Sequence, residues 1–555
     1  MKRKKNRNLF RNRIFDFLIL ALITIVLYGN IIHLWWTYDD PQTLKHAIRY
    51  SPLQYFFQPH IWQEYTPRFL TPLLLYSFDI DIFLFDLTPQ WFYVHQLFII
   101  WLCSIMVYLI LKKWVQRPFA FLGAGLFLLG SPVAVIAQQL MTRHYVDGLL
   151  FALISLYLFV KSLEKSKIGW AYGSALVYAL SMAAKELYVP LAFLLIALPH
   201  GKWKQRLKYS VPHFVLLLLY VGWRLWMLGT LWGGNDGHIS ARNVIFLPYN
   251  AIHPFFEPKS PFGIIAAVAV IGASIIFLTK NWKRVFFVLW VWGLILFPIL
   301  PVAHSPNPRF FLVVWLAVAL FLSFMTSFFW NNGLSGKIIS AGLLLIVLLH
   351  TLFDSRRVWH NHLPSAYRSS DEGMFIFDGA GPNDLLRQPF YEGGHYFEGI
   401  QFLKRYRGIP AAGKWFHDDI YMCEHDLSGK KIWQYAATEG RLLDITGSIE
   451  GIAKAYCGRI ISDAPLSIRA NYSKNVASWE LGPYTDGHYA FLTGDGMTKT
   501  NVPPTGFMRV HFENFMKFRI RYESPEGWIT YSPDLTVRIQ DNKMEINWER
   551  TGAGG

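Results

Sequence analysis

The sequence predicts a polytopic α-helical membrane protein with about 11 spans, followed by a C-terminal domain outside the membrane of mixed, mainly β structure. Of the 555 residues, 53% are hydrophobic and 17% aromatic, which exceeds the apolar content of soluble domains. The apolar residues gather in long runs. The basic residues, which give a net charge of +16, cluster in short segments between those runs. This clustering favours membrane topology over nucleic-acid binding.

The first apolar run, 14–34, follows the basic segment MKRKKNRNLFRNR. This pattern resembles a signal peptide, but the run is too long and has no A-x-A-like cleavage site. We therefore expect an uncleaved first span with the N-terminus in the cytoplasm.

Further apolar runs are long enough to approach the roughly 30 Å of a hydrocarbon core. They lie at 91–111, 118–140, 145–160, 168–184, 187–199, 210–230, 261–279, 285–302, 309–330 and 337–353. The 168–199 region allows two interpretations. It is either two short spans broken at Lys185 and Glu186, or one span followed by a re-entrant segment.

Alternate loops carry an excess of basic residues, as expected of cytoplasmic loops under the positive-inside rule. These residues are Lys112, Lys113 and Arg117; Lys161, Lys165 and Lys167; Lys202, Lys204, Arg206 and Lys208; Lys280, Lys283 and Arg284; and Lys337. The first outer loop, 35–90, has more acidic than basic residues. Its amphipathic stretches, such as SPLQYFFQPHIW, predict helices at the membrane surface.

We divide the chain into a transmembrane domain, 1–353, and an extracytoplasmic domain, 354–555. After residue 353 the composition becomes polar and no further run is long enough to span. The last third of the chain alternates apolar and polar residues in short stretches such as HYAFLTG and FMKFRIRYES, which indicates antiparallel strands. Cys423 and Cys457 are the only cysteines of this domain, so in an oxidising compartment we expect them to form a disulfide.

Two adjacent carboxylates, Asp39 and Asp40, follow the first span on the outer side. Asp40 precedes Pro41, which fits a helix N-cap with proline at the first helical position. That explanation leaves Asp39 without a structural role. Since ionisable groups at the membrane are usually functional, we interpret Asp39 as a candidate catalytic residue.

Other charged residues interrupt apolar segments. Arg143 and Asp147 open the run at 145–160, either as a local i, i+4 pair or as part of a site at the outer surface. Lys185 and Glu186 lie within an apolar region and, being adjacent on the chain, do not face each other. Arg224 and Arg309 are further candidate outer cations.

The sequence contains no motif of the common nucleotide hydrolases or proteases. P-loop, GxSxG and HExxH patterns are absent, and the histidines have no metal-ligand spacing. We therefore expect no metal site.

The order of these charged motifs resembles that of GT-C glycosyltransferases, and most closely the branch similar to protein O-mannosyltransferases, which use polyprenyl-phosphate sugars. The resemblance covers roughly residues 14–330. The segments that carry it are TYDDPQTL, MTRHYVDGLLFALISLYLF, LSMAAKELYVPLAFLL and NPRFFLVVW.

The resemblance implies an inverting transfer of a sugar from a lipid monophosphate to an acceptor at the outer face of the membrane. Asp39 would be the general base, although the Asp-Asp pair leaves open whether Asp39 or Asp40 is the base. The substrate-binding residues would be Arg143, Asp147, Lys185, Glu186, Arg224 and Arg309, with Asp147 ordering the donor sugar or the acceptor and Glu186 lining the cavity. A monophosphate donor requires no cofactor, whereas a diphosphate donor would favour a divalent metal.

The expected partners are a polyprenyl-phosphate-linked sugar, a protein, lipid or glycan acceptor, and membrane lipids. The expected location is a plasma membrane, such as the inner membrane of a bacterium. Two alternatives remain open at this stage. One is a flippase or transporter for a lipid-linked saccharide, and the other is a membrane-anchored binding or assembly protein of the envelope.

Overall fold

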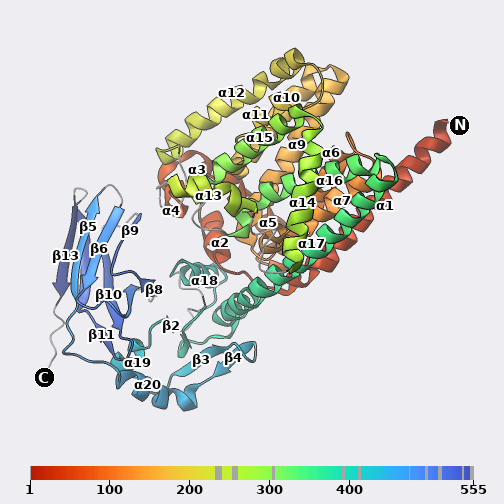
Figure 1. Ribbon diagram of the computed structural model, residues 1–555. Coiled ribbons are helices and arrows are strands. Elements are labelled where there is room, and N and C mark those ends of the chain that lie inside the picture. The colour runs from red at the N-terminus through yellow and green to blue at the C-terminus, as the bar shows by residue number, and fades with distance from the viewer. Residues whose placement is uncertain are drawn as a thin grey trace. The chain divides into compact units, whose positions relative to one another are not determined.

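The computed structural model describes residues 2–231, 241–252, 261–302, 307–390, 394–410, 414–473, 476–493, 498–509, 515–540 and 543–549. The chain forms two compact units (Figure 1). The membrane unit comprises Met1–Leu34 and His46–Ala366. The C-terminal unit comprises Trp35–Lys45 and Tyr367–Gly555.

The membrane unit is helical, because in lipid each backbone N–H and C=O needs a partner within its own segment. Its helices are α1 (Lys2–Tyr28), α3 (Pro52–Phe57), α4 (Pro59–Tyr65), α5 (Pro72–Phe85), α6 (Pro89–Leu111), α7 (Arg117–Leu128), α8 (Ser131–Ala137), α9 (Arg143–Lys165), α10 (Ile168–Ala184), α11 (Leu191–Ala197), α12 (Trp203–Leu228), α13 (Ala241–Ile252), α14 (Pro261–Thr279), α15 (Trp282–Leu296) and α16 (Leu312–Trp330). Helix α2 (Asp40–Arg49) and helix α17 (Gly333–Met374) each contribute residues to both units.

Among the described residues, seven helices are long and apolar enough to cross a membrane, or eight if the bent pair α7 and α8 forms one span. The chain is thus an integral membrane protein, but this criterion gives fewer spans than the 11 expected. The remaining three runs form shorter apolar helices, at 168–184, 186–197 and 263–279. At 1.5 Å of rise per residue, 17 residues cover only about 25 Å, which is less than a hydrocarbon core.

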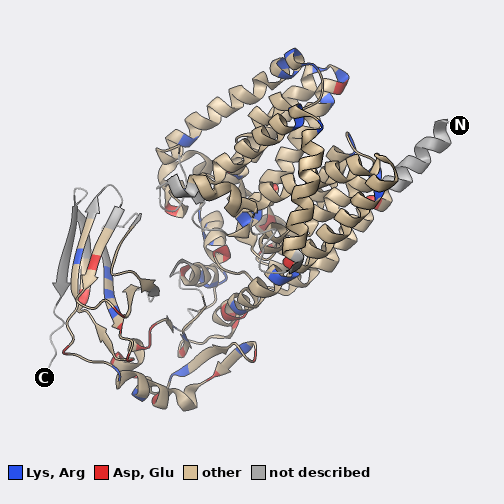
Figure 2. Ribbon diagram, viewed as in Figure 1, with Lys and Arg blue, Asp and Glu red and all other residues tan. Residues whose placement is uncertain are grey.

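The basic loop that holds Lys113 and Arg117 forms ion pairs with two other segments of the membrane unit. Arg117 pairs with Asp16 at 2.7 Å, and Lys113 pairs with Glu164 at 2.8 Å. Charged residues in the membrane unit lie mainly at helix ends, with long uncharged stretches between them (Figure 2). This arrangement fits the loop alternation of the positive-inside rule.

The C-terminal unit begins with a mixed sheet of order β2-β1-β3-β4, formed by β1 (Asp384–Arg387), β2 (Lys414–Phe416), β3 (Lys431–Ala436) and β4 (Arg441–Asp444). Strand β1 is parallel to both β2 and β3, with Leu385 opposite Lys414 and Ile432. Helix α18 (Gly394–Tyr406) connects β1 to β2, as a parallel crossover requires. This parallel pairing was not predicted from the sequence.

Two antiparallel sheets follow. One has the order β5-β6-β9, from β5 (Ser467–Ser473), β6 (Val476–Gly482) and β9 (Thr505–Arg509). The other has the order β13-β12-β10-β7-β8, with β11 (Ile529–Tyr531) paired to β10 (Phe515–Glu523). Its remaining strands are β7 (His488–Thr493), β8 (Thr498–Val502), β12 (Asp534–Gln540) and β13 (Lys543–Glu549). The prediction that the C-terminal region has mixed structure with β-strands is thus confirmed.

The alternation in FMKFRIRYE explains the packing of β10. Successive strand side chains point to opposite faces, so Ile520 and Tyr522 share one face and are both buried. They pack with Leu481, Tyr489 and Leu535 in the core of this region. A second core lies under the mixed sheet, around Leu385, Phe416, Met422, Ile432 and Ile449.

Cys423 and Cys457, the two cysteines expected to pair, form a disulfide with Cα atoms 5.8 Å apart. The bond joins α19 (Ile420–Glu424) to α20 (Ile449–Cys457). It therefore fixes the segment that follows β2 against the helix that follows β4.

Candidate functional site

The two candidate catalytic carboxylates lie in the part of the C-terminal unit formed by Trp35–Lys45. Helix α2 begins at Asp40, and the Asp39 carbonyl accepts a hydrogen bond from the Thr43 amide at 3.0 Å. Asp39, rather than Asp40, therefore occupies the cap position, and the expected cap was wrong by one residue. The Asp40 carboxylate points back along the chain instead, accepting from the Thr37 amide at 2.9 Å.

The environments of the two carboxylates differ. Asp40 is fully buried and closes the turn that precedes α2. Asp39 is partly exposed and follows Tyr38, whose φ of 50° lies in the left-handed region. Such a backbone costs free energy in a residue with a bulky side chain, and the turn persists because its surroundings hold it.

Two serines at the end of α17 hold this turn. Ser370 accepts from the Trp35 amide at 2.8 Å, and Ser369 accepts from the Tyr38 amide at 3.0 Å. Helix α18 packs closely against the same segment, since a Cβ added to Gly399 would lie 2.5 Å from the Pro41 carbonyl carbon. Asp39 is thus presented by a segment fixed on both sides.

The second group of candidate residues surrounds a helix break in the membrane unit. Helix α10 ends at Ala184, Lys185 has extended backbone angles, and a short 3-10 helix, Glu186–Tyr188, leads to α11. The Tyr188 ring packs on Gly148 at the start of α9, where an added Cβ would lie 2.4 Å from that ring. Region 168–199 therefore consists of short helices broken at Lys185 and Glu186, and neither is long enough to count as a span by itself, so both interpretations of this region stand.

Lys185 is only 8% exposed. Its amine lies over the rings of Phe69, at 4.4 Å, and Tyr145, at 4.7 Å. Two arginines, Arg309 and Arg224, repel its charge. No carboxylate of the described residues pairs with Lys185, so the amine is a buried cation held by aromatic faces alone.

The two flanking arginines are not equivalent. Arg224 forms an ion pair with Glu186, whose carboxylate also accepts from the Leu70 amide at 2.7 Å. Arg309 donates to the Gln139 amide oxygen at 3.2 Å, a neutral acceptor. Within the described part of the chain, this region thus has three cations and one paired carboxylate.

Arg143 and Asp147 lie in a different, closed arrangement. Arg143 is fully buried and pairs with Asp81, which lies 62 positions earlier on α5. The guanidinium also donates to the Phe92 carbonyl at 2.7 Å, and the His95 ring contacts the other Asp81 oxygen at 2.7 Å. Asp147 is buried close enough to interact with Arg143 and Asp81.

Asp81 and His95 were not predicted from the sequence to belong to this cluster. Asp81 was counted only as an acidic residue of the 35–90 loop, although it lies in the apolar stretch FDIDIFLF. That position was an available signal, since a carboxylate on a buried apolar helix requires a cation partner.

The described residues contain no group of three or more His, Cys, Asp or Glu side chains placed to hold a metal ion. The two groups of side chains described above offer different chemistry. The break at Lys185 offers positive charge to an anion, and the Asp39 turn offers a carboxylate to a proton donor.

A comparison with known protein families finds a match, which lies within the membrane unit. Residues 71–226 match the family model "Dolichyl-phosphate-mannose-protein mannosyltransferase". The match includes five of the six expected substrate-binding residues, namely Arg143, Asp147, Lys185, Glu186 and Arg224. No curated protein matches the chain.

Solved structures of the oligosaccharyltransferase of Archaeoglobus fulgidus are similar to the chain. The complex of this enzyme, AglB, with an inhibitory peptide and a dolichol-phosphate has a TM-score of 0.45 at 12% identity, covering 88% of this chain and 74% of that one. The complex with Zn and sulfate has a TM-score of 0.44 at 13% identity, covering 87% and 72%.

The resemblance seen in the motifs is confirmed by the family match. Residues 71–226, rather more than a quarter of the chain, are similar to the family of dolichyl-phosphate-mannose-protein mannosyltransferases, whose model they match.

Proposed function

We propose that this chain transfers a sugar, with inversion at the anomeric carbon, from a polyprenyl-phosphate carrier to an acceptor at the outer face of the membrane. The observation that carries the proposal is the buried Lys185 amine, which lies over two aromatic rings, is repelled by the charges of two arginines and pairs with no carboxylate of the described residues. A buried charge without a partner is costly. The phosphate of a lipid-linked sugar is an anion that suits the Lys185 amine, and the lipid tail stays in the bilayer while the phosphate binds.

Lys185 and Arg309 bind the carrier phosphate in this mechanism. As the bond from the anomeric carbon to the phosphate oxygen breaks, negative charge grows on the phosphate, and fixed cations stabilise that charge. The phosphate leaves already ionised and needs no general acid. Arg224 contributes less because Glu186 neutralises it.

Asp39 is the proposed general base. The acceptor hydroxyl is a poor nucleophile, and a carboxylate that takes its proton in the transition state typically contributes about 10²–10⁴ in rate. Asp39 is the more accessible of the two carboxylates, whereas Asp40 is buried and occupied with the Thr37 amide. We therefore assign the chemistry to Asp39 and a structural role to Asp40.

The remaining substrate-binding residues have supporting roles. Arg143 is engaged with Asp81, so we assign it to holding the start of α9 rather than to binding phosphate. Asp147, one turn further along that helix, orders the sugar or the acceptor in this proposal. A monophosphate donor needs no metal in this chemistry, because Lys185 and Arg309 supply the positive charge.

Transfer of radiolabelled sugar from a polyprenyl phosphate by the purified full-length protein tests the proposal. Asp39→Asn keeps the shape and removes the proton acceptor, so we expect turnover to fall by about a hundredfold or more while donor binding is retained. Asp40→Asn is the matched control. Its amide oxygen still accepts from Thr37, and we expect a much smaller loss.

Two outcomes would overturn the proposal. Near-normal transfer by both single variants and by the double variant would remove the proposed base. Movement of the labelled lipid across liposomes without any transfer would instead support a flippase.

A further inference from the structure

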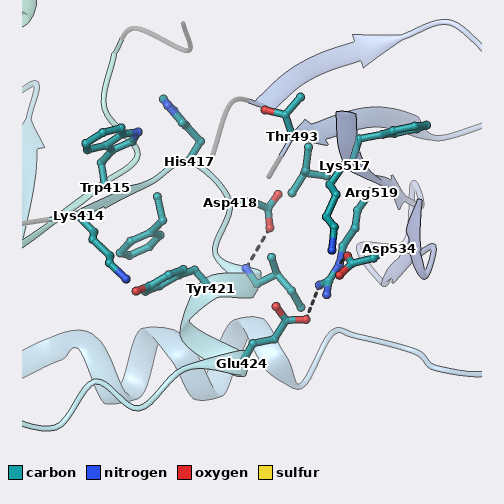
Figure 3. A pocket seen from close by; sticks show the side chains of 14 residues that line it. Lys414, Trp415, His417, Asp418, Tyr421, Glu424, Thr493, Lys517, Arg519 and Asp534 are labelled. Atoms are coloured by element: carbon teal, nitrogen blue, oxygen red, sulfur yellow. Dashed lines mark hydrogen bonds and ion pairs between the residues drawn. The ribbon is translucent and has the colours of Figure 1, made fainter. Parts of the chain in front are cut away.

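The C-terminal unit contains a cavity of about 500 Å³ that the proposed transfer chemistry does not use (Figure 3). One wall comes from β2 and α19, and the other from β7, β10 and β12. The lining residues are Lys414, Trp415, Phe416, His417, Asp418, Ile420, Tyr421, Glu424, Leu492, Thr493, Lys517, Phe518, Arg519 and Asp534. Its volume falls within the range of roughly 300–1,000 Å³ typical of small-molecule sites.

The walls of this cavity are fixed before any ligand arrives. Asp418 accepts hydrogen bonds from the Tyr531 hydroxyl at 2.7 Å and the Tyr456 hydroxyl at 3.1 Å, and it pairs with Arg521. The Cys423–Cys457 disulfide ties α19, which carries the lining residues Ile420, Tyr421 and Glu424, to α20. A site held in this way loses little conformational entropy when it binds.

Aromatic rings form much of the first wall. Trp415 is partly exposed in the cavity and stacks on the buried Phe397, with ring centroids 4.2 Å apart and planes at 18°. Tyr421 is held between Phe416, at 4.9 Å, and His425, at 4.0 Å. Trp415 thus presents a supported, rigid ring to the cavity, whereas Tyr421 has neighbours on both faces.

Charged groups line the cavity in balanced numbers. The cations Lys414, Lys517 and Arg519 stand against the carboxylates Asp418, Glu424 and Asp534. Arg519 holds both Glu424 and Asp534 in ion pairs, so these carboxylates are oriented. Balanced charge gives no net attraction for a phosphate or another anion, but it supplies hydrogen-bond donors and acceptors side by side.

We propose that this cavity is a binding site for a neutral saccharide. The hydroxyl groups of a sugar both donate and accept hydrogen bonds, so they match the lysine amines and the carboxylates of the lining. The apolar face of a sugar ring packs on Trp415. Six of the 14 lining residues are charged, which disfavours apolar peptide side chains. The site extends the proposed function, because it gives a glycosyltransferase a place to hold a glycan chain as acceptor or product.

Saturation-transfer NMR on the full-length protein in detergent tests the proposal, with neutral oligosaccharides of about two to four sugars as probes. Acidic oligosaccharides and a tripeptide serve as comparisons. We expect the neutral saccharides to bind, and Trp415→Leu to weaken binding by about tenfold through loss of the aromatic face. Trp479→Leu is the matched control. Trp479 lies on β6, outside the cavity, and its loss should leave binding unchanged.

Lys517→Ala provides a second variant in case Trp415→Leu does not fold. Lys517 is exposed, and its removal should weaken saccharide binding by about threefold to tenfold with the melting temperature unchanged. The measurement is repeated on Asp39→Asn protein, where we expect binding without transfer, so this site and the transfer mechanism are tested separately. Preference for the peptide or the acidic probes, equal binding by the Trp415 and Trp479 variants, or no saccharide binding would overturn the proposal.

Discussion

Arg143 and Lys185 are both buried cations of the membrane unit, yet their surroundings are opposite. Arg143 is fully buried against Asp81, and its guanidinium also bonds to the Phe92 carbonyl and contacts His95. Lys185 is 8% exposed, lies over two aromatic rings and is repelled by the charges of two arginines. In the first arrangement the cation has a carboxylate partner within the protein. The second, as far as the described residues extend, lacks its anion.

This difference separates a structural ion pair from a binding site. A buried pair that loses one partner leaves an uncompensated charge, so Asp81 and Arg143 stabilise the fold only together. A buried cation that already lacks a carboxylate partner costs free energy in the empty protein, and that cost is recovered when an anion binds. We therefore expect opposite effects on stability: removing the Asp81 charge destabilises the fold, whereas removing the Lys185 charge does not.

The largest effect on stability is expected for Asp81→Asn, which leaves Arg143 buried and unpaired. We expect a loss of about 3–5 kcal/mol, seen as a large fall in the thermal unfolding midpoint of the purified protein in detergent. Asp79→Asn is the matched control, since Asp79 lies on the same helix and bonds to Tyr55 rather than to a cation. Equal midpoints for the two variants would contradict a structural role for the Arg143 pair.

A somewhat smaller effect is expected for Arg309→Gln, this time on donor affinity. Loss of a charge-assisted hydrogen bond to phosphate costs about 1.5–3 kcal/mol, or about 10- to 150-fold in affinity. Equilibrium binding of labelled polyprenyl-phosphate sugar measures it. Arg284→Gln, which removes a cation that stacks on Phe277 and Phe328, should bind donor normally. An unchanged affinity in Arg309→Gln would remove this residue from the phosphate site.

The smallest effect concerns the pH dependence of stability. Burial raises the pKa of the Asp79 carboxyl to about 6, although its hydrogen bond with Tyr55 acts in the opposite direction. The folded protein therefore binds a proton that the unfolded chain releases above pH 3.8, and stability from this group is lost as pH rises from about 4 to 6. After allowance for solvent screening, we expect about 1–2 kcal/mol.

Unfolding midpoints measured between about pH 4 and pH 7 should therefore fall more steeply in the wild type than in Asp79→Asn. Parallel curves would show that Asp79 does not take up a proton on folding. That result would also weaken the use of Asp79→Asn as the control for Asp81→Asn.

Local patterns in the sequence predicted much of the membrane unit. Each of the apolar runs is a helical segment, and the charged break at Lys185 and Glu186 lies between two short helices. The length of a run did not decide whether its helix is long enough to span, because the chain bends at breaks such as Gly130 and Lys185. The candidate disulfide followed from the cysteine count in one domain.

Long-range contacts could not be predicted from these patterns. The partner of Arg143 lies 62 residues away on α5, and nothing in the local sequence indicates that these helices meet. The cap of α2 was misplaced because Asp40 bonds backward to Thr37, and either register satisfies the Asp-Asp-Pro pattern. The saccharide cavity was missed for the same reason, since its walls come from segments about 414–424 and 492–534.

The most direct test of the central claim is donor binding by Lys185→Met, measured without acceptor alongside the unfolding midpoint. We expect donor affinity to fall by about 10- to 150-fold, because the phosphate loses a buried cation. We also expect the unfolding midpoint to stay level or rise, because methionine fills the space without an unpaired charge. Unchanged donor affinity, or a destabilisation as large as that of Asp81→Asn, would show that Lys185 is a structural residue and would contradict the phosphate site.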